Sequence, residues 1–274
     1  MPADRDHDLL LVTGASGKQG AHLMPLLQRA GWKRLRLAVH SAARRARRPC
    51  TTSGRPSTRT RRRSGYNVVD AAVAERRRTG SGPGVKHFVY SSVLNTQLRK
   101  MLNHDCKRYV EEYLMESRPA KQQGQEQLVY TANFNPTIPF SFLALRDLAE
   151  AAAVVLDQRE RHFYVQYPLV STARPVSYTE VVAIASELLG REIRIETRPL
   201  DEAVRALLKV LFGGEEVEEI NQRTVDAAQR MLLFYNHRGL IGNPNVLEWL
   251  IGRKPTTHRE WMQLQLEKAA GKEA

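Results

Sequence analysis

The chain has 274 residues, of which 42% are hydrophobic, and a formal net charge of +13. This length allows one or two domains with a sizeable core, and no apolar stretch approaches the ~20 residues that a membrane span needs. The polar segment Met1 to Asp8 lacks the features of a signal peptide, so we expect a cytoplasmic protein without membrane contact and leave a nuclear location open. Cys50 and Cys106 match no metal-ligand spacing, so no metal site and no disulfide are expected.

The positive charge is concentrated in one segment. Nine arginines lie between Arg44 and Arg63 without an acidic residue, which leaves only +4 on the other 254 residues. Ser41 to Gly65 contains no aromatic residue and no Leu, Ile or Val, so it cannot offset its ordering entropy, and we expect it to be disordered. Such a run could neutralise phosphates, but it lacks the aromatic side chains that stack on bases, which disfavours specific nucleic-acid binding.

Strand and helix patterns alternate in the N-terminal part. Leu9 to Thr13 is a continuous apolar run that predicts a buried parallel strand. Lys18 to Ala30 predicts a helix that Gly31 should end and Pro25 should kink or shorten. Further along, the pattern predicts strands at Leu35 to Val39 and Val85 to Tyr90, and helices at Asn67 to Glu75 and Asn103 to Ser117.

The C-terminal part carries local helix signals. Ser177 with Glu180, and Thr257 with Glu260, have the spacing of capping boxes that open two helices, the first of which Gly190 should end. The remaining patterns predict a strand at Leu128 to Ala132, a helix at Arg146 to Asp157 and a short strand containing Ile193 and Ile195. The alternation of strands and helices predicts an α/β fold with a parallel sheet.

A glycine-rich turn follows the first predicted strand. Its spacing is G-x-x-G-x-x-G, which gives a tight turn, a backbone open to a pyrophosphate and a helix N-terminus facing the phosphates. The alternative is a strand-to-helix turn with incidental glycines. The dinucleotide interpretation assigns cofactor contacts to Thr13, Gly14, Ala15, Ser16, Gly17, Lys18, Gln19 and Gly20.

The choice of dinucleotide depends on the end of the second strand. An NAD site usually places Asp or Glu there, but no acidic residue occurs from Leu9 to Val69. The residues that could instead meet a 2′-phosphate are His40, Ser41, Arg44 and Arg45. The cofactor is therefore expected to be NADP, unless Arg44 and Arg45 only begin the arginine-rich run.

Several motifs together resemble the NmrA-like family of the atypical short-chain dehydrogenase/reductase superfamily. They are the glycine turn, the sequence VKHFVYSSV at 85–93, NHDCK at 103–107, VEEYL at 110–114, DLAEA at 147–151 and the stretch 242–255. The resemblance implies a doubly wound, Rossmann-type parallel sheet that binds NADP, expected over residues 1–157. A smaller, mostly helical C-terminal α/β region is expected over 158–274. Residues 41–65 and 118–127 replace core elements of the family, so the sheet is expected to be incomplete.

The resemblance also implies roles for individual residues. Ser91 and Ser92 would lie beside the nicotinamide, and Lys107, the candidate catalytic residue, would contact the nicotinamide ribose. The usual acid/base tyrosine, four residues before the lysine, is replaced by Asn103, whose amide is no acid at neutral pH. The resemblance thus favours an NADP-binding redox sensor or regulator, whose protein partner is left open. The alternative is an isoflavone-reductase-like, NADP-dependent oxidoreductase acting on an unknown small molecule.

Overall fold

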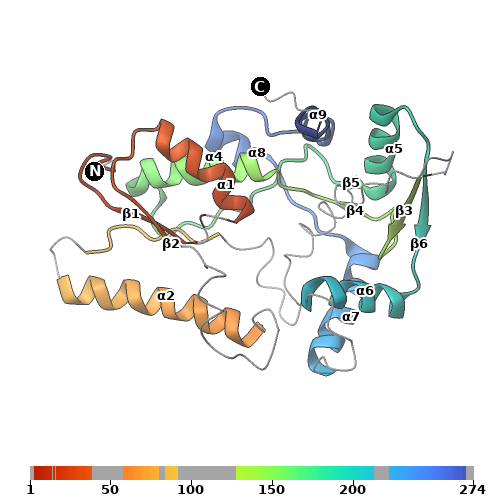
Figure 1. The fold of residues 1–274 in the computed structure, drawn as a ribbon, viewed down its shortest axis with the longest axis horizontal. Coiled ribbons are helices and arrows are strands. Elements are labelled where there is room, and N and C mark those ends of the chain that lie inside the picture. The colour runs from red at the N-terminus through yellow and green to blue at the C-terminus, as the bar shows by residue number, and fades with distance from the viewer. Residues whose placement is uncertain are drawn as a thin grey trace. The chain divides into compact units, whose positions relative to one another are not determined.

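The computed structural model describes residues 3–13, 15, 17–38, 58–79, 84–91, 128–212 and 222–269 (Figure 1). The chain divides into two compact units. Unit 1 comprises Met1–Ser91 and Leu148–Gln166, and unit 2 comprises Ser92–Asp147 and Tyr167–Ala274. The domain boundary expected at residue 157 stays a prediction.

A parallel strand pair joined by a helix forms the centre of unit 1. β1 (Leu10–Thr13) pairs with β2 (Leu35–Ala38), with Leu10 opposite Leu35 and Thr13 opposite Ala38. α1 (Lys18–Arg29) connects the two strands, as expected for a βαβ unit. The buried residues of this small core are Val12, Ala15, Leu27 and Trp32. The strand and helix predicted here are thus confirmed.

Two details of this βαβ unit differ from expectation. β1 is not buried on both faces, since Leu11, which lies on the face opposite Val12, is 61% exposed. Pro25 does not shorten α1, which continues to Arg29. Proline removes one backbone donor, and the helix continues beyond it, with Ala30 N–H donating to the carbonyl of Leu26 at 2.9 Å.

The disorder expected for Ser41 to Gly65 is wrong for its last part. α2 (Thr58–Thr79) is a 22-residue helix that contains the predicted helix Asn67 to Glu75 and extends back to Thr58. Arginine is a good helix former, so the arginine-rich residues before 66 can belong to the same helix, although a helical sequence pattern is recognisable only from Asn67 onward. Residues 41–57 lie outside the described part of the chain.

The strand predicted at Val85 to Tyr90 is also wrong, since residues 84–91 have no regular secondary structure. Their apolar residues show β-propensity, but a strand needs a hydrogen-bonded neighbour, and none of the described strands pairs with this segment. Tyr90 is accordingly 71% exposed. Lys86 instead binds Asp8 at 2.5 Å, and Asp8 binds Arg159 at 2.7 Å. The helix predicted at Asn103 to Ser117 lies outside the described residues.

Unit 2 contains two further strand pairs and most of the helices. β3 (Leu128–Ala132) runs parallel to β6 (Ile193–Thr197), and β4 (Pro139–Phe140) runs antiparallel to β5 (Val176–Ser177). Aromatic rings fill much of its core: Phe134, Phe140, Phe142, Tyr178 and Tyr235. The helices described wholly within unit 2 are α5 (Tyr178–Leu189), α6 (Leu200–Phe212), α7 (Gln222–Arg238), α8 (Asn245–Ile251) and α9 (His258–Ala269). The helix α4 (Leu145–Asp157) begins in unit 2 and continues into unit 1, which also contains the 3-10 helix η2 (Arg159–His162). The strands at 128–132 and 193–195 and the helix at 146–157 are confirmed.

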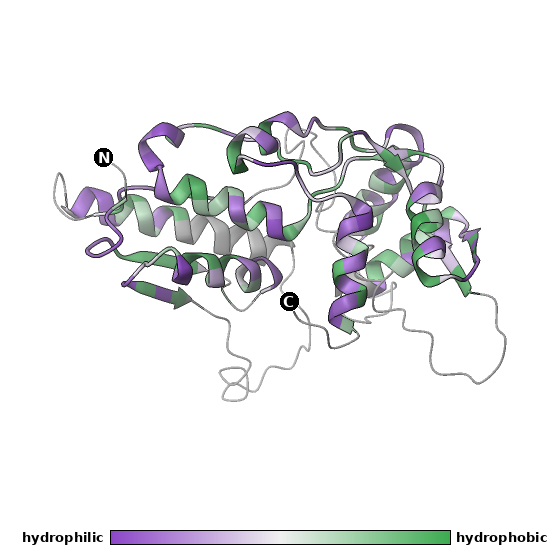
Figure 2. Cartoon of the chain, turned by 90° about the horizontal axis from the view of Figure 1, so that it is seen from above, coloured by the Kyte–Doolittle hydropathy of each residue, from purple (hydrophilic) through white to green (hydrophobic). Residues whose placement is uncertain are grey.

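The predicted helix caps are present. The Ser177 hydroxyl accepts from the Glu180 backbone N–H at 3.2 Å, and the Glu180 carboxylate accepts from the Ser177 N–H at 2.9 Å. Gly190 ends α5 in the left-handed conformation, at φ 62°. The helices in Figure 2 carry both hydrophilic and hydrophobic residues, and none in the described chain is long and apolar enough to span a membrane.

Candidate functional site

The turn between β1 and α1 places a helix N-terminus at the carboxyl end of a parallel strand. β1 ends at Thr13, and α1 begins at Lys18. Gly17 is the N-cap residue with an extended backbone, φ −82° and ψ 171°, and its carbonyl accepts from the Ala21 N–H at 2.8 Å. In open α/β sheets, ligands bind beyond the carboxyl ends of the strands, which is where this turn lies.

The surroundings of Gly20 explain why the third position of the motif is a glycine. A Cβ atom at this position would lie 2.2 Å from the carbonyl oxygen of Ala15 and 2.6 Å from its Cα. These are backbone atoms, so the clash could be relieved only by moving the turn away from the helix. Both residues are buried. The glycine therefore permits the close approach of α1 to the turn that dinucleotide-binding folds require.

The N-terminus of α1 has the electrostatic character of an anion site. Its first turn contains no acidic residue, and Gly17 supplies no side-chain cap. The first N–H groups of a helix have no intrahelical acceptor, and the helix dipole adds partial positive charge at that end. Gly17, Lys18 and Gln19 are exposed. This arrangement can bind a phosphate through backbone donors.

The structure brings together only part of the predicted cofactor site. Thr13, Ala15, Gly17, Lys18, Gln19 and Gly20 lie on the β1–α1 turn and the first turn of α1. Ser91 is exposed at the end of the irregular segment 84–91, and so does not follow a strand as the strand predicted at Val85 to Tyr90 implied. The predicted residues outside the described part of the chain are Gly14, Ser16, His40, Ser41, Arg44, Arg45, Ser92 and Lys107.

A buried carboxylate that was not singled out as a site residue forms a polar cluster in unit 2. Asp147 is fully buried and accepts hydrogen bonds from the Ser171 hydroxyl, the Thr256 hydroxyl and the Thr256 N–H, each at 2.7 Å, and from Arg253 at 2.8 Å. Burial alone would raise the pKa of Asp147, but these hydrogen bonds outweigh it and hold the pKa below its ordinary value. Each of these donors is already hydrogen-bonded to the carboxylate, so the cluster has a structural role and holds the three segments together.

The described residues contain no group of three or more His, Cys, Asp or Glu side chains able to hold a metal ion.

The βαβ unit and its glycine turn define a Rossmann-type α/β fold, which solved structures with bound NADPH or NADP share. NADPH-dependent quinone oxidoreductase QOR2 from Escherichia coli, complexed with NADPH, is 16% identical with a TM-score of 0.56, covering 93% of this chain and 99% of that chain. Triphenylmethane reductase from Citrobacter sp. is 18% identical with a TM-score of 0.56, covering 96% and 99%. NmrA, a negative transcriptional regulator in complex with NADP, is 15% identical with a TM-score of 0.55, covering 98% of both chains. No family model and no curated protein matches the chain.

Proposed function

We propose that the chain binds NADP(H) at the β1–α1 turn and acts as a redox sensor or regulator without standard short-chain dehydrogenase turnover. The observation that carries this proposal is the packing of Gly20 against Ala15 beside an uncapped helix N-terminus free of acidic residues. Backbone donors at such a terminus suit a pyrophosphate. The structures of QOR2 with NADPH and of NmrA with NADP, which share the fold, support a dinucleotide as the anion.

The preference for NADP over NAD rests on charge. No acidic residue lies between Leu9 and Val69 to hold an unmodified ribose 2′-hydroxyl, and the segment after β2 is rich in arginine. Arg44 and Arg45, with His40 and Ser41, are the proposed partners of the 2′-phosphate.

The residue at the position of the usual catalytic acid/base favours a regulatory role over catalysis. Asn103 stands four residues before Lys107, where a short-chain dehydrogenase carries tyrosine, and an amide cannot deliver a proton at neutral pH. The similarity to NmrA, which is a negative transcriptional regulator, fits this interpretation.

The second candidate is an NADPH-dependent reductase acting on a small molecule. It is favoured by the equally high TM-scores of quinone oxidoreductase QOR2 and triphenylmethane reductase. Hydride transfer itself needs no tyrosine, because the nicotinamide carries that chemistry, so Lys107 would be the side chain to test.

Titration calorimetry of the full chain with NADP⁺ and NAD⁺ tests the proposal. NADP⁺ should bind more tightly, and Gly17→Asp should abolish binding because its carboxylate would face the pyrophosphate. Asp is also a favourable N-cap, so α1 should be at least as stable in this variant, which separates loss of binding from loss of folding. Gly17→Asn is the matched neutral control and should weaken binding less. Equal affinity for NAD⁺, or full binding by Gly17→Asp, would contradict the proposed site.

The regulatory role is tested separately by following NADPH absorbance with a panel of ketones, quinones and enones. No turnover is expected. Steady oxidation of NADPH that disappears in Lys107→Ala would instead establish the reductase.

A further inference from the structure

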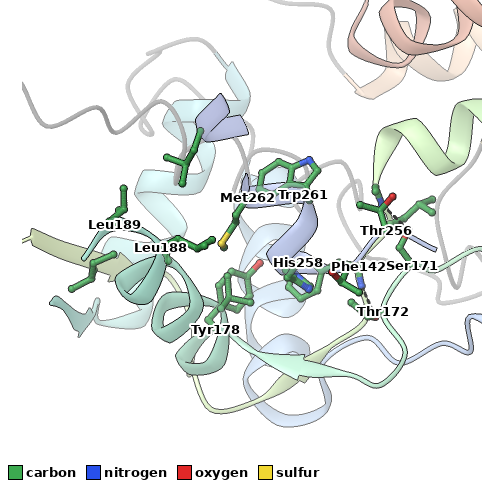
Figure 3. Close-up of a pocket in the computed structure, with 17 residues that line it drawn as sticks. Phe142, Ser171, Thr172, Tyr178, Leu188, Leu189, Thr256, His258, Trp261 and Met262 are labelled. Carbon is green, nitrogen blue, oxygen red and sulfur yellow. Dashed lines mark hydrogen bonds between the residues drawn. The ribbon is translucent and has the colours of Figure 1, made fainter. Parts of the chain in front are cut away.

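Unit 2 contains a cavity whose lining includes no residue of the glycine turn and which has no part in the proposed function. Its volume is about 140 Å³, and it lies between α5, α9 and the segment 142–144 that follows β4 (Figure 3). One wall is formed by Val181, Ala185 and Leu188 of α5, and the other by Trp261, Met262 and Leu266 of α9. Two apolar lining residues, Leu189 and Leu266, are exposed and mark the opening to solvent.

The size and lining of the cavity suit one aromatic ring. An engineered apolar cavity of about 150 Å³ in another protein binds benzene, so 140 Å³ provides room for a single six-membered ring. Tyr178, Trp261 and Met262 turn toward the same space in Figure 3. Aromatic edges and a thioether sulfur both pack well against an aromatic ring.

Charge excludes an ionised ligand. Among the described lining residues there is no Lys, Arg, Asp or Glu, so a carboxylate or an ammonium group would be buried without a partner. The ligand is therefore neutral.

Most of the hydroxyl groups in the wall are already committed. The Ser171 and Thr256 hydroxyls donate to Asp147 at 2.7 Å, and the Thr257 hydroxyl donates to Glu260 at 2.9 Å. None of these protons is available to a ligand. The polar contacts of a ligand must come from elsewhere in the lining.

Thr172 and His258 are polar side chains of the lining with hydrogen-bonding capacity left in the described structure. Thr172 is 5% exposed, and its oxygen accepts from the Phe142 N–H at 3.2 Å, but its own proton reaches no acceptor among the described residues. His258 lies edge-on to the Phe142 ring, with centroids 4.5 Å apart, and its ring nitrogens make no hydrogen bond to any described residue. Burial lowers the pKa of His258 to about 4, although the Glu180 carboxylate acts to raise it. The imidazole is thus neutral at pH 7 and offers one donor and one acceptor.

We propose that this cavity binds a neutral monocyclic phenol, whose ring fills the apolar part and whose hydroxyl pairs with His258, with Thr172 as a further donor. A phenolic hydroxyl donates one proton and accepts another, which matches the bare nitrogen of a neutral imidazole and the free proton of a threonine. The apolar lining supplies affinity, and the two polar groups orient the ligand.

The test is titration calorimetry of the full chain with phenol and with toluene, which has a methyl group in place of the hydroxyl. Both should bind with one site per chain. In His258→Phe the ratio of phenol affinity to toluene affinity should fall about five-fold, since a hydrogen bond contributes on the order of 1 kcal/mol. An unchanged ratio in this variant, or no binding of either compound to the wild-type chain, would overturn the proposal.

Substitutions that fill the cavity with a larger side chain provide the second arm of the test. Ala185→Leu should abolish binding of both compounds, whereas Ala183→Leu, on the exposed side of the same helix, should leave binding unchanged. If Ala185→Leu does not fold, Leu189→Trp at the exposed opening replaces it, with the same expected loss. Binding that survives a folded cavity-filling variant places the ligand elsewhere and refutes the site. Because neither arm uses NADP, failure here is distinguishable from failure of the proposed function.

Discussion

At the scale of single residues, Asp147 shows how a buried charge is held in unit 2. Its carboxylate accepts four hydrogen bonds from three residues that lie 24, 106 and 109 positions away in the sequence. The contacts tie the start of α4 to the loop between α8 and α9. A buried charge with all of its hydrogen bonds made is stable in place, and removing the charge leaves the donors around it without acceptors.

Asp147→Asn is therefore expected to destabilise unit 2 by about 2–4 kcal/mol, because the new amide group would face donors that require an acceptor. Urea unfolding followed by Trp261 fluorescence measures this, with Trp32 and Trp249 changed to Phe. Asp201→Asn is the matched control, since Asp201 and its partner Arg205 are both exposed, and it should change the stability by less than about 0.5 kcal/mol.

The lowered pKa of Asp147 also predicts how the stability of the folded chain depends on pH. The pKa of Asp147 is lower in the folded chain than its ordinary value, so the stabilisation is complete above about pH 4 and is lost as the pH falls through the folded-state pKa. The loss of stability on acidification should be smaller in Asp147→Asn than in the wild type. If the free energy of unfolding falls equally with pH in the two chains, this assignment is contradicted.

Sequence reasoning reached some of these residue contacts and missed others for one physical reason. The pair Thr257 and Glu260 was predicted because a capping box has a fixed local spacing, and the N–H of Glu260 does bind the Thr257 hydroxyl at 3.2 Å. The partners of Asp147 have no such spacing, since they are brought together only by the packing of three distant segments. The role of Gly20 was predictable because the turn and the helix it touches are sequence neighbours.

At the scale of elements, α5 is defined at both ends by local chemistry. Ser177 and Glu180 satisfy the first backbone donors, and Gly190 ends the helix in a conformation that costs other residues about 1 kcal/mol or more. The helix packs its buried residues Val181 and Val182 into unit 2. Its boundaries therefore do not depend on distant contacts, which is why the sequence predicts them closely.

Ser177→Ala should lower the free energy of unfolding of unit 2 by about 1 kcal/mol, because it removes the oxygen that accepts from the Glu180 N–H. Ala183→Ser places the same hydroxyl in the middle of α5 at an exposed position and should cost only about 0.5 kcal/mol, the difference in helix propensity. Both are measured by urea unfolding with the Trp261 reporter. Equal effects of the two substitutions would show that the cap contributes nothing beyond propensity.

Elements that depend on partners were predicted less well than elements that depend on their own residues. The apolar run at Val85 to Tyr90 has the composition of a strand, yet Phe88 and Val89 are exposed and no described strand pairs with the segment. The run at Leu9 to Thr13 does form a strand, because β2 lies beside it. Composition indicates that a segment can be a strand, but only a neighbouring strand supplies its hydrogen bonds.

At the scale of the whole molecule, the two units differ in how much apolar core they contain. In the described part of the chain, unit 2 has a cluster of sixteen buried residues, six of them aromatic, whereas the cluster of unit 1 has four buried residues. Burial of apolar surface is the main favourable contribution to folding. Unit 1 also leaves Leu9, Leu11 and Leu37 more than half exposed. We therefore expect unit 1 to be the less stable of the two.

This difference predicts two separate unfolding transitions, which single-tryptophan chains can resolve. Trp32 belongs to the core of unit 1, and Trp261 lies on α9 in unit 2. In urea, the fluorescence of Trp32 should change at a lower concentration than that of Trp261. A ligand that binds only the folded unit 1 stabilises it by about 2.7 kcal/mol at a concentration of 100 Kd. Saturating NADP⁺ should therefore move the Trp32 transition to higher urea and leave the Trp261 transition in place. Coincident transitions that shift together would instead show that the chain unfolds as one cooperative body.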